Sequence, residues 1–123
     1  MLKISSILIG VRSLAVAKPF YENVFGITFE EFRPPFASFI FDNIEFNIEE
    51  DAPTRDPKWA QNYIGGRKQV ALRTDDLDQF LIHAQAQGAT LIKEPHTHPW
   101  GWREAIIADL DNNQFIVEQE IVH

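Results

Sequence analysis

The chain has 123 residues and no cysteine, a length that suits one compact domain and a composition that excludes disulfides, thiolate catalysis and cysteine metal ligands. Its 18 acidic and 11 basic residues give a net charge of −7, which argues against non-specific binding to nucleic acid or anionic membranes and is compatible with a cationic small molecule. The absence of cysteine also fits a protein of the cytoplasm.

The first half of the chain predicts one helix within a series of strands. Residues 7–11 form a short apolar strand, and apolar side chains then recur at helical spacing up to Gly26, which ends the helix. Ser13 is the candidate N-cap, but Pro19 is costly inside a helix, so we expect the helix to start near Val16. Three further strands are predicted at 27–32, 36–41 and 44–50.

The second half predicts the same order of elements. It follows a stretch at 51–67 that is rich in proline, glycine and charge, which is typical of a connection. Residues 70–88 then read as a strand, a polar break and a helix, which Asp75 or Asp76 caps and Gly88 ends. Three strands are predicted after it, at 90–93, 103–109 and 114–120.

The two halves are copies of one unit. DNIEFNIEED at 42–51 matches DNNQFIVEQE at 111–120, so that Phe46 corresponds to Phe115. The N-terminal segment imitates a short signal peptide, but Arg12 interrupts it and it has a counterpart inside the chain, so we expect no secretory signal. The sequence predicts an α+β fold with two tandem βαβββ modules, in which each four-stranded sheet carries a helix on one face. Residues 1–123 would form a single domain, with module one at about 1–51, a connection at 52–67 and module two at about 68–123.

The repeat and two sequence stretches carry a resemblance to a known family. Paired βαβββ units, FYENVFG at 20–26 and PWGWREAIIADLDNNQF at 99–115 resemble the vicinal-oxygen-chelate superfamily of glyoxalases, bleomycin-resistance proteins and extradiol dioxygenases. Family members usually carry proline and glycine in the late turn, where this chain has Leu110 and Asn112. The resemblance implies curled mixed sheets around a cleft, with the helices on the outer faces.

The resemblance also implies where a metal would bind. Metal-using members place one ligand, usually histidine or glutamate, on each of the first, fourth, fifth and eighth strands. The matching positions here are Ser6, Asn47, Gln69 and Ile116. The isoleucine side chain has no lone pair and the other three side chains are neutral, whereas such metals prefer imidazole or carboxylate. A shift of the alignment by two residues would recruit only glutamates, so we predict no metal, no cofactor and no catalytic residue.

Alternation along the strands predicts which side chains face the cleft. Ile44, Phe46 and Ile48 should pack under the helix, and their neighbours on the same strand should face the cleft. Trp100 and Trp102 belong to the connection expected between the sixth and seventh strands, where they offer flat apolar surfaces to a planar group or a cation. The predicted ligand-binding residues are Glu45, Asn47, Glu49, Trp59, Gln69, Arg73, Trp100, Trp102, Ile116 and Glu118.

The resemblance is closest in character to metal-free bleomycin-resistance proteins, which are homodimers that sequester a cationic, partly aromatic antibiotic. It implies a small-molecule-binding homodimer for this chain, with no nucleic-acid or membrane partner, and favours a binding protein over an enzyme. Arg73 argues against a purely cationic ligand, and it either pairs with a glutamate or binds an anionic group.

Two alternatives stay open. One is a glyoxalase- or dioxygenase-like enzyme with a non-standard metal site, in which His96 or His98 acts together with Glu94 or Glu104. The other is a subunit whose cleft serves a protein partner. The sequence does not name the ligand, and it does not tell whether modules pair within a chain or across the dimer.

Overall fold

The computed structural model describes residues 1–51 and 63–121, and in them the order of elements is βαβββ followed by βαβββ. The chain divides into two compact units, Met1–Gly65 and Gly66–His123. The predicted α+β class with two βαβββ modules is confirmed, since each described module has a four-stranded mixed sheet and one helix. Among the described residues, no helix is long and apolar enough to cross a membrane.

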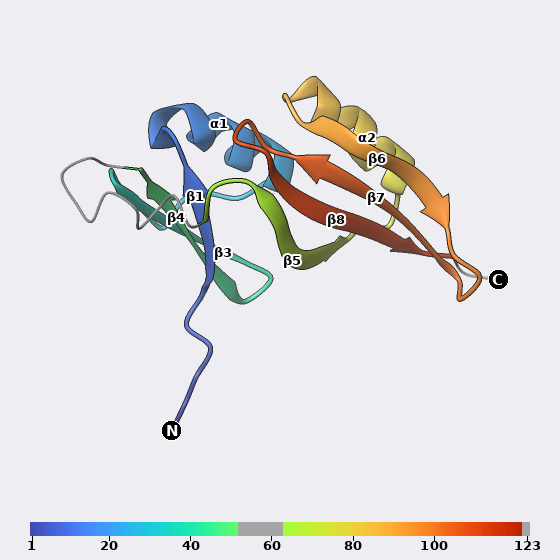
Figure 1. Ribbon diagram of the computed structural model, residues 1–123, viewed down its shortest axis with the longest axis horizontal. Helices are drawn as coiled ribbons and strands as arrows, with labels where there is room; N and C mark the ends of the chain where they lie inside the picture. Colours follow the sequence, from blue (N-terminus) through green and yellow to red (C-terminus); the bar gives the residue numbers. More distant parts are fainter. Residues whose placement is uncertain (52–62, 122–123) are drawn as a thin grey trace. The chain divides into compact units, whose positions relative to one another are not determined.

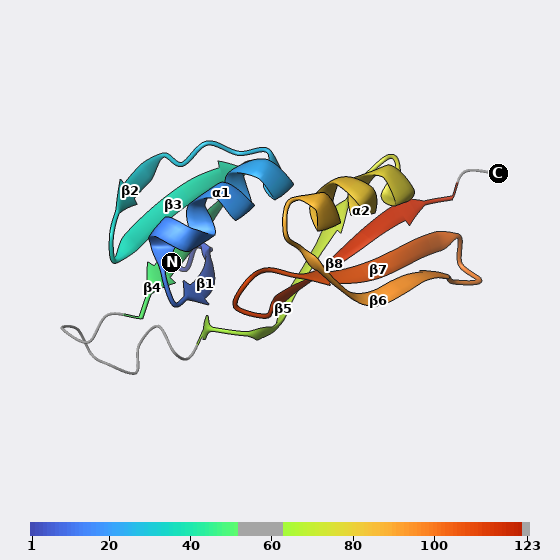
Figure 2. The same cartoon turned by 90° about the horizontal axis from the view of Figure 1, so that it is seen from above.

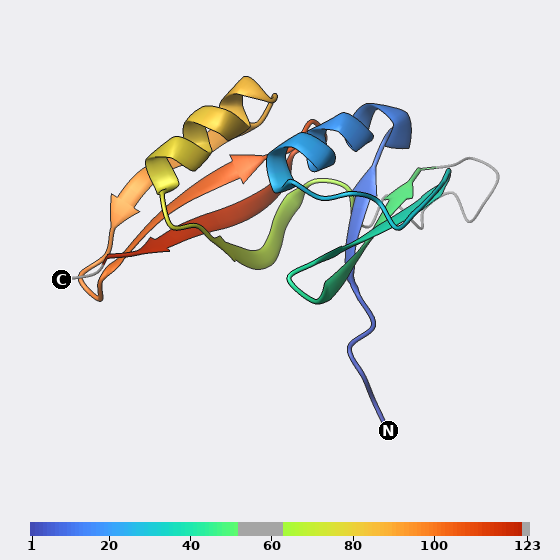
Figure 3. The same ribbon diagram turned by 180° about the vertical axis from the view of Figure 1, so that it is seen from behind.

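The first module has the strand order β1-β4-β3-β2, in which β1 runs parallel to β4 and the other pairs are antiparallel. Its helix lies on one face of this sheet, and the views from above and behind agree (Figure 1, Figure 2 and Figure 3). The opposite face is open within the module. The elements are β1 (Ile7–Val11), α1 (Leu14–Phe25), β2 (Glu31–Arg33), β3 (Phe36–Phe41) and β4 (Ile44–Glu50).

The second module repeats this topology with the strand order β5-β8-β7-β6, and β5 runs parallel to β8. Helix α2 covers one face of that sheet (Figure 1). The parallel pair contains a register shift between Arg67 and Ala71, and Gln69 within it has a φ of +46°. The elements are β5 (Gly66–Arg73), α2 (Leu77–Ala86), β6 (Thr90–Thr97), β7 (Trp102–Ala108) and β8 (Asn113–Glu120).

Helix α1 starts earlier than the sequence predicts. It begins at Leu14, not near Val16, and Pro19 lies inside it. Ser13 caps it as expected, with Oγ accepting from the Val16 N–H at 3.4 Å, and the Ser13 carbonyl accepts from the Ala17 N–H at 3.0 Å. These bonds hold the first turn, so the missing N–H of Pro19 does not delay the helix. The helix ends at Gly26, whose φ of +71° suits glycine.

Helix α2 follows its predicted signals more closely. Of the two candidate caps it is Asp76 that acts, with Oδ1 accepting from the Gln79 N–H at 3.1 Å. The helix buries Leu77, Leu81 and Ala84 against its own sheet. Capping of this kind contributes about 0.5–2 kcal/mol to stability.

Several strands differ from their predicted bounds, and β5 begins at Gly66, inside the predicted connection at 51–67. The strand predicted at 27–32 is only Glu31–Arg33, and the one predicted at 90–93 continues to Thr97, past Pro95. The pairing of β6 with β7 contains two register shifts. Because of these shifts, the strand continues beyond the residues whose apolar and polar side chains alternate. The connection between β6 and β7 is therefore a short turn, and His96 lies within a strand.

The core of the first module is mainly aromatic. Tyr21 and Phe25 on α1 pack onto Phe39 and Phe46 of the sheet, and the last two rings stack at 5.0 Å with an interplanar angle of 8°. Such pairs add about 0.5–1.5 kcal/mol each beyond the buried area. Ile44 was expected in this core but is 46% exposed, because it is the first residue of β4 after the Asp42–Asn43 turn.

Candidate functional site

The open face of the first sheet carries a pocket of about 360 Å³. Phe46 and Ile48 of β4 are buried on the helix side, so their neighbours lie on the open side, as alternation predicts. Strand pairing aligns Glu49 with Phe36 and Asn47 with Ser38 on that side. The lining residues are Glu31, Arg33, Phe36, Ala37, Ser38, Glu45, Asn47 and Glu49.

The pocket is acidic. Arg33 is the cationic residue among the described lining residues, and its Nη2 lies 2.9 Å from Glu31 Oε2 in an exposed ion pair. The Glu45 side chain forms no hydrogen bond or ion pair with any described residue, and Glu49 is buried, with 9% of its surface exposed. Strand pairing places the carboxylate-bearing Glu49 opposite Phe36, which is 48% exposed.

The first two family metal positions converge. Ser6 directly precedes β1, the neighbour of β4, and Asn47 Nδ2 on β4 donates a hydrogen bond of 2.9 Å to Ser6 Oγ. The amide and hydroxyl therefore satisfy each other, and neither is a strong ligand for a transition metal. These residues do not fit the metal that the superfamily's metal-using members hold.

The other two metal positions belong to the second sheet. Ile116 pairs with Ala71 across β8 and β5, and its side chain offers no lone pair. Gln69 lies in the irregular part of β5, where the register shifts. The described residues contain no group of three histidine, aspartate or glutamate side chains that is placed to hold a metal ion.

A row of ionisable side chains crosses the open face of the second sheet. Strand pairing aligns Arg73 with Glu118, Glu118 with Glu104, and Glu104 with His96. The Arg73 guanidinium carbon lies 4.6 Å from the centre of the Trp102 ring, a cation–π distance. The structure thus brings two predicted ligand-binding residues, Arg73 and Trp102, into contact.

Trp100 has a different neighbour. Its ring stacks on His98, with centroids 4.3 Å apart and an interplanar angle of 9°, and 70% of the residue stays exposed. His98 Nε2 lies 3.0 Å from Glu104 Oε1, but that nitrogen is buried and forms no hydrogen bond with a described residue. The two histidines, whose rings are 4.8 Å apart, are packed into the β6–β7 hairpin and do not stand on a long loop.

Among the described residues, Lys68 shows a clear change in proton affinity. Desolvation by burial lowers the pKa of its ammonium group below 10.5, and the charge of Asp109 opposes the change. Lys68 lies on β5 of the second sheet.

Several of these residues follow from the sequence and others do not. Glu45, Asn47 and Glu49 line the pocket as alternation suggested, whereas Glu31 and Arg33 were missed, because Arg33 lies outside the strand predicted at 27–32 and Glu31, inside it, was not assigned to the cleft face. Strand pairing, which sequence periodicity does not give, is the signal that finds them. Trp59 lies outside the described residues.

Solved structures confirm the fold. A glyoxalase/bleomycin resistance protein/dioxygenase family enzyme from Burkholderia phytofirmans PsJN is 24% identical, with a TM-score of 0.79, over 95% of this chain and 98% of that one. A superfamily member from Sphaerobacter thermophilus DSM 20745 is 25% identical, with a TM-score of 0.74, over 98% of both chains. The fosfomycin resistance protein FosX from Listeria monocytogenes is 17% identical, with a TM-score of 0.76, over 99% of this chain and 96% of that one.

The comparison with curated proteins found no match. A family model, however, matches nearly the whole length of the sequence, over residues 3–117. The chain therefore belongs to the Glyoxalase/Bleomycin resistance protein/Dioxygenase superfamily.

Proposed function

We propose that this chain is a metal-independent small-molecule-binding protein, a cytoplasmic homodimer that sequesters a cationic, amphiphilic ligand with an aromatic part. The observation that carries the proposal is the pocket on the first sheet, whose lining combines Glu45 and Glu49 with the half-exposed Phe36, the residue that strand pairing aligns with Glu49. A ligand that is both cationic and aromatic can contact carboxylates and an aromatic ring in the same pocket. Members of this superfamily usually bind small molecules and dimerise, which supports the proposal.

The charge of the pocket favours a cation. Arg33 is already paired with Glu31, so it adds little positive charge to the field of the other two carboxylates. Glu49 is largely withdrawn from water, where its attraction for a cation is less screened than at the surface. The net charge of −7 attracts the same class of ligand at longer range.

The chemistry of the family metal positions supports binding without a metal. Ser6 and Asn47 bond to each other, and Ile116 has no donor atom. The alternative enzyme with a metal at His96 or His98 needs a third strong ligand. Glu104 is close to His98, yet these residues do not form a metal-binding group of three in the described part of the chain.

Calorimetric titration tests the proposal. Simple aromatic amines are titrated into the protein, each beside its N-acetylated neutral analogue, and bleomycin is titrated on its own. We expect micromolar binding of the cationic forms and about tenfold weaker binding of the neutral ones, the loss of about 1.4 kcal/mol. Equal affinity of the two forms, or no heat at millimolar ligand, counts against the proposal.

Two matched variants test whether the ligand binds at the pocket of the first sheet. Glu45→Gln keeps the shape and removes one charge, and it should weaken cation binding by about tenfold. Glu94→Gln makes the same change at an exposed position of β6 that is not among the described lining residues of the pocket, and it should change affinity by less than about twofold. If both variants weaken binding equally, only net charge is being measured.

A further inference from the structure

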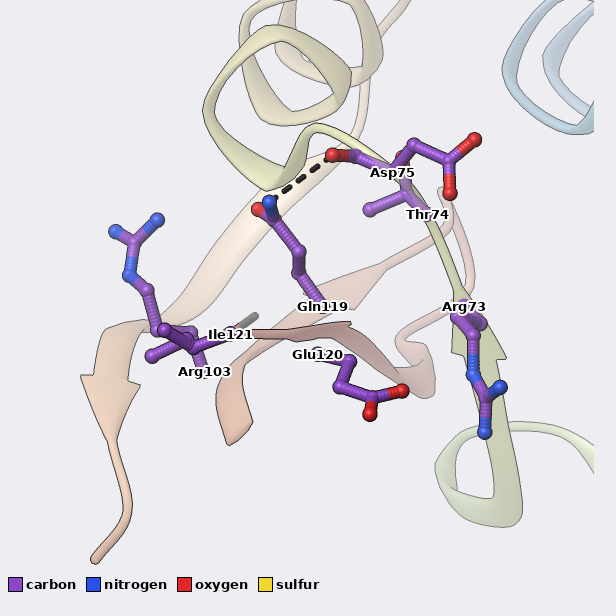
Figure 4. A pocket seen from close by; sticks show the side chains of 7 residues that line it. All are labelled: Arg73, Thr74, Asp75, Arg103, Gln119, Glu120 and Ile121. Atoms are coloured by element: carbon purple, nitrogen blue, oxygen red, sulfur yellow. Dashed lines mark hydrogen bonds between the residues drawn. The ribbon is translucent and has the colours of Figure 1, made fainter. Parts of the chain in front are cut away.

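A second pocket, of about 640 Å³, lies where β5 and β8 end and α2 begins. Its described lining residues all belong to the second module, and none of them is among the described residues that line the pocket of the proposed function. Figure 4 shows the side chains that line it. They are Arg73, Thr74, Asp75, Arg103, Gln119, Glu120 and Ile121.

Two of these side chains, Arg103 and Gln119, form contacts with residues of α2 or of the segment that precedes it. Arg103 forms a forked contact with Asp78, with nitrogen–oxygen distances of 3.2 and 3.4 Å. Gln119 accepts from the Leu77 N–H at 2.9 Å and donates to the Asp75 carbonyl at 2.9 Å, the bond drawn in Figure 4. These contacts fix the wall of the pocket beneath α2, and they leave Arg103 largely neutralised.

The Arg73 side chain has no comparable polar contact among the described residues. It forms no hydrogen bond or ion pair with any described residue, and its guanidinium carbon lies 4.6 Å from the centre of the Trp102 ring. Stacking on an aromatic ring holds the guanidinium while leaving its in-plane N–H groups free to donate. A guanidinium held like this is suited to a carboxylate, which it binds through two parallel hydrogen bonds.

An unpaired carboxylate stands on the same face. Strand pairing makes Glu120 the direct neighbour of Trp102, the ring on which Arg73 rests. Glu120 is exposed and makes no ion pair with a described residue. Figure 4 shows Arg73 and Glu120 both extending away from α2. Arg73, which strand pairing aligns with Glu118, and Glu120, two residues further along β8, therefore lie on one face, and neither forms an ion pair with a described residue.

The presence of one cationic and one anionic side chain determines which class of ligand the pocket favours. A purely anionic molecule at Arg73 meets the repulsion of Glu120 and of Asp75, and a purely cationic molecule at Glu120 meets that of Arg73. A small zwitterion satisfies both groups. An α-amino acid carries its ammonium and carboxylate groups on one carbon, so it needs a cationic and an anionic side chain close together.

We propose that this pocket binds a small zwitterion of the α-amino-acid class. Its carboxylate pairs with Arg73, its ammonium group pairs with Glu120, and an apolar side chain contacts Ile121. Trp102 acts as a positioning residue, because it holds the guanidinium plane. The site is independent of the proposed function, so failure of one leaves the other standing.

Three matched probes test the need for both charges. They are L-leucine, N-acetyl-L-leucine, which keeps only the carboxylate, and L-leucinamide, which keeps only the amine. Affinity is measured by calorimetry, and the site is located by ¹⁵N NMR shifts. We expect leucine to shift residues of this pocket and to bind at least about tenfold more tightly than either blocked form, the loss of one charge-assisted contact.

Two variants give crossed effects that a merely structural role would not produce. Arg73→Gln should weaken leucine by about tenfold and leave leucinamide unchanged, whereas Glu120→Gln should weaken leucine equally and leave N-acetyl-leucine unchanged or tighter. Arg67→Gln, an exposed change on the same strand, is the matched control and should bind like the parent. The proposal is overturned by equal binding of the three probes, by NMR shifts outside this pocket, by the absence of crossed effects, or by no binding of leucine at about 10 mM.

Discussion

Glu50 accepts a hydrogen bond from the backbone N–H of Leu14, with 2.9 Å between Oε1 and the nitrogen. Glu50 is the last residue of β4, and Leu14 is the first residue of α1, 36 positions earlier. The second module repeats the contact, because Gln119 Oε1 accepts from the Leu77 N–H at the same distance. In each module, the end of the last strand thus satisfies an N–H at the start of the helix that no turn of the helix can satisfy.

Removing this acceptor should destabilise each module. Glu50→Ala leaves the Leu14 N–H without its partner, and we expect it to lower the free energy of unfolding by about 1–2 kcal/mol in urea titrations. Glu50→Gln keeps an acceptor, as Gln119 does, and should cost only the charge contribution at a helix N-terminus, about 0.3–1 kcal/mol. Equal losses in the two variants would show that the carboxylate acts through its charge alone.

The turn between β7 and β8 depends on Asp109. This residue is 5% exposed, and its Oδ1 accepts from the backbone N–H groups of Asp111 and Asn113 at 2.9 and 2.8 Å. Its Oδ2 accepts from the fully buried Asn113 side chain at 2.8 Å. Asn112 then adopts a φ of +62°, where family members usually have glycine.

We expect Asp109→Ala to lower the free energy of unfolding by about 2–4 kcal/mol, because several buried donors lose their partner at once. Urea denaturation followed by circular dichroism measures the change. Asp111→Ala, whose side chain is only partly buried on the same turn, is the matched control and should cost less than about 1 kcal/mol. A loss at Asp109 no larger than that of the control would contradict the role given to the carboxylate.

The internal repeat explains why the fold could be predicted from the sequence. Phe46 and Phe115 occupy equivalent positions, and both are buried under the helix of their own module. The residues of the candidate site were harder to predict, because the site depends on which side chains of neighbouring strands contact one another. Arg73 contacts Trp102 only through the register of three strands, and β6 and β5 both contain shifts that alternation does not show. The pairing of Ser6 with Asn47 is likewise a property of neighbouring strands.

The lowered pKa of Lys68 has a consequence for stability against pH. Its ammonium group has a lower pKa in the folded chain than its value of 10.5 in the unfolded one, mainly because burial disfavours the charge. Between these two values the unfolded chain binds more protons than the folded one. The stability contributed by Lys68 therefore rises as the pH rises through that window.

Comparison with Lys68→Met isolates this effect, because methionine keeps the length of the side chain and does not titrate. We expect the difference in unfolding free energy, parent minus variant, to move in favour of the parent as the pH rises toward 10.5. Urea titrations at matched ionic strength measure it. A difference that is constant over this range, or that moves toward the variant, would contradict the assignment.

The metal positions give the last prediction. Ser6 and Asn47 bond to each other, Gln69 is a neutral amide and Ile116 has no donor atom, so protein purified without a histidine tag should contain less than about 0.1 equivalent of zinc, nickel, manganese or iron. Addition of these ions in excess should leave the melting temperature unchanged, because binding to the folded state alone would raise it. His98→Ala supplies the control, since His98 is the histidine whose buried nitrogen lies 3.0 Å from a carboxylate oxygen. Stoichiometric metal in the parent that is lost in His98→Ala would place a non-standard site in the β6–β7 hairpin and would favour the enzyme over the binding protein.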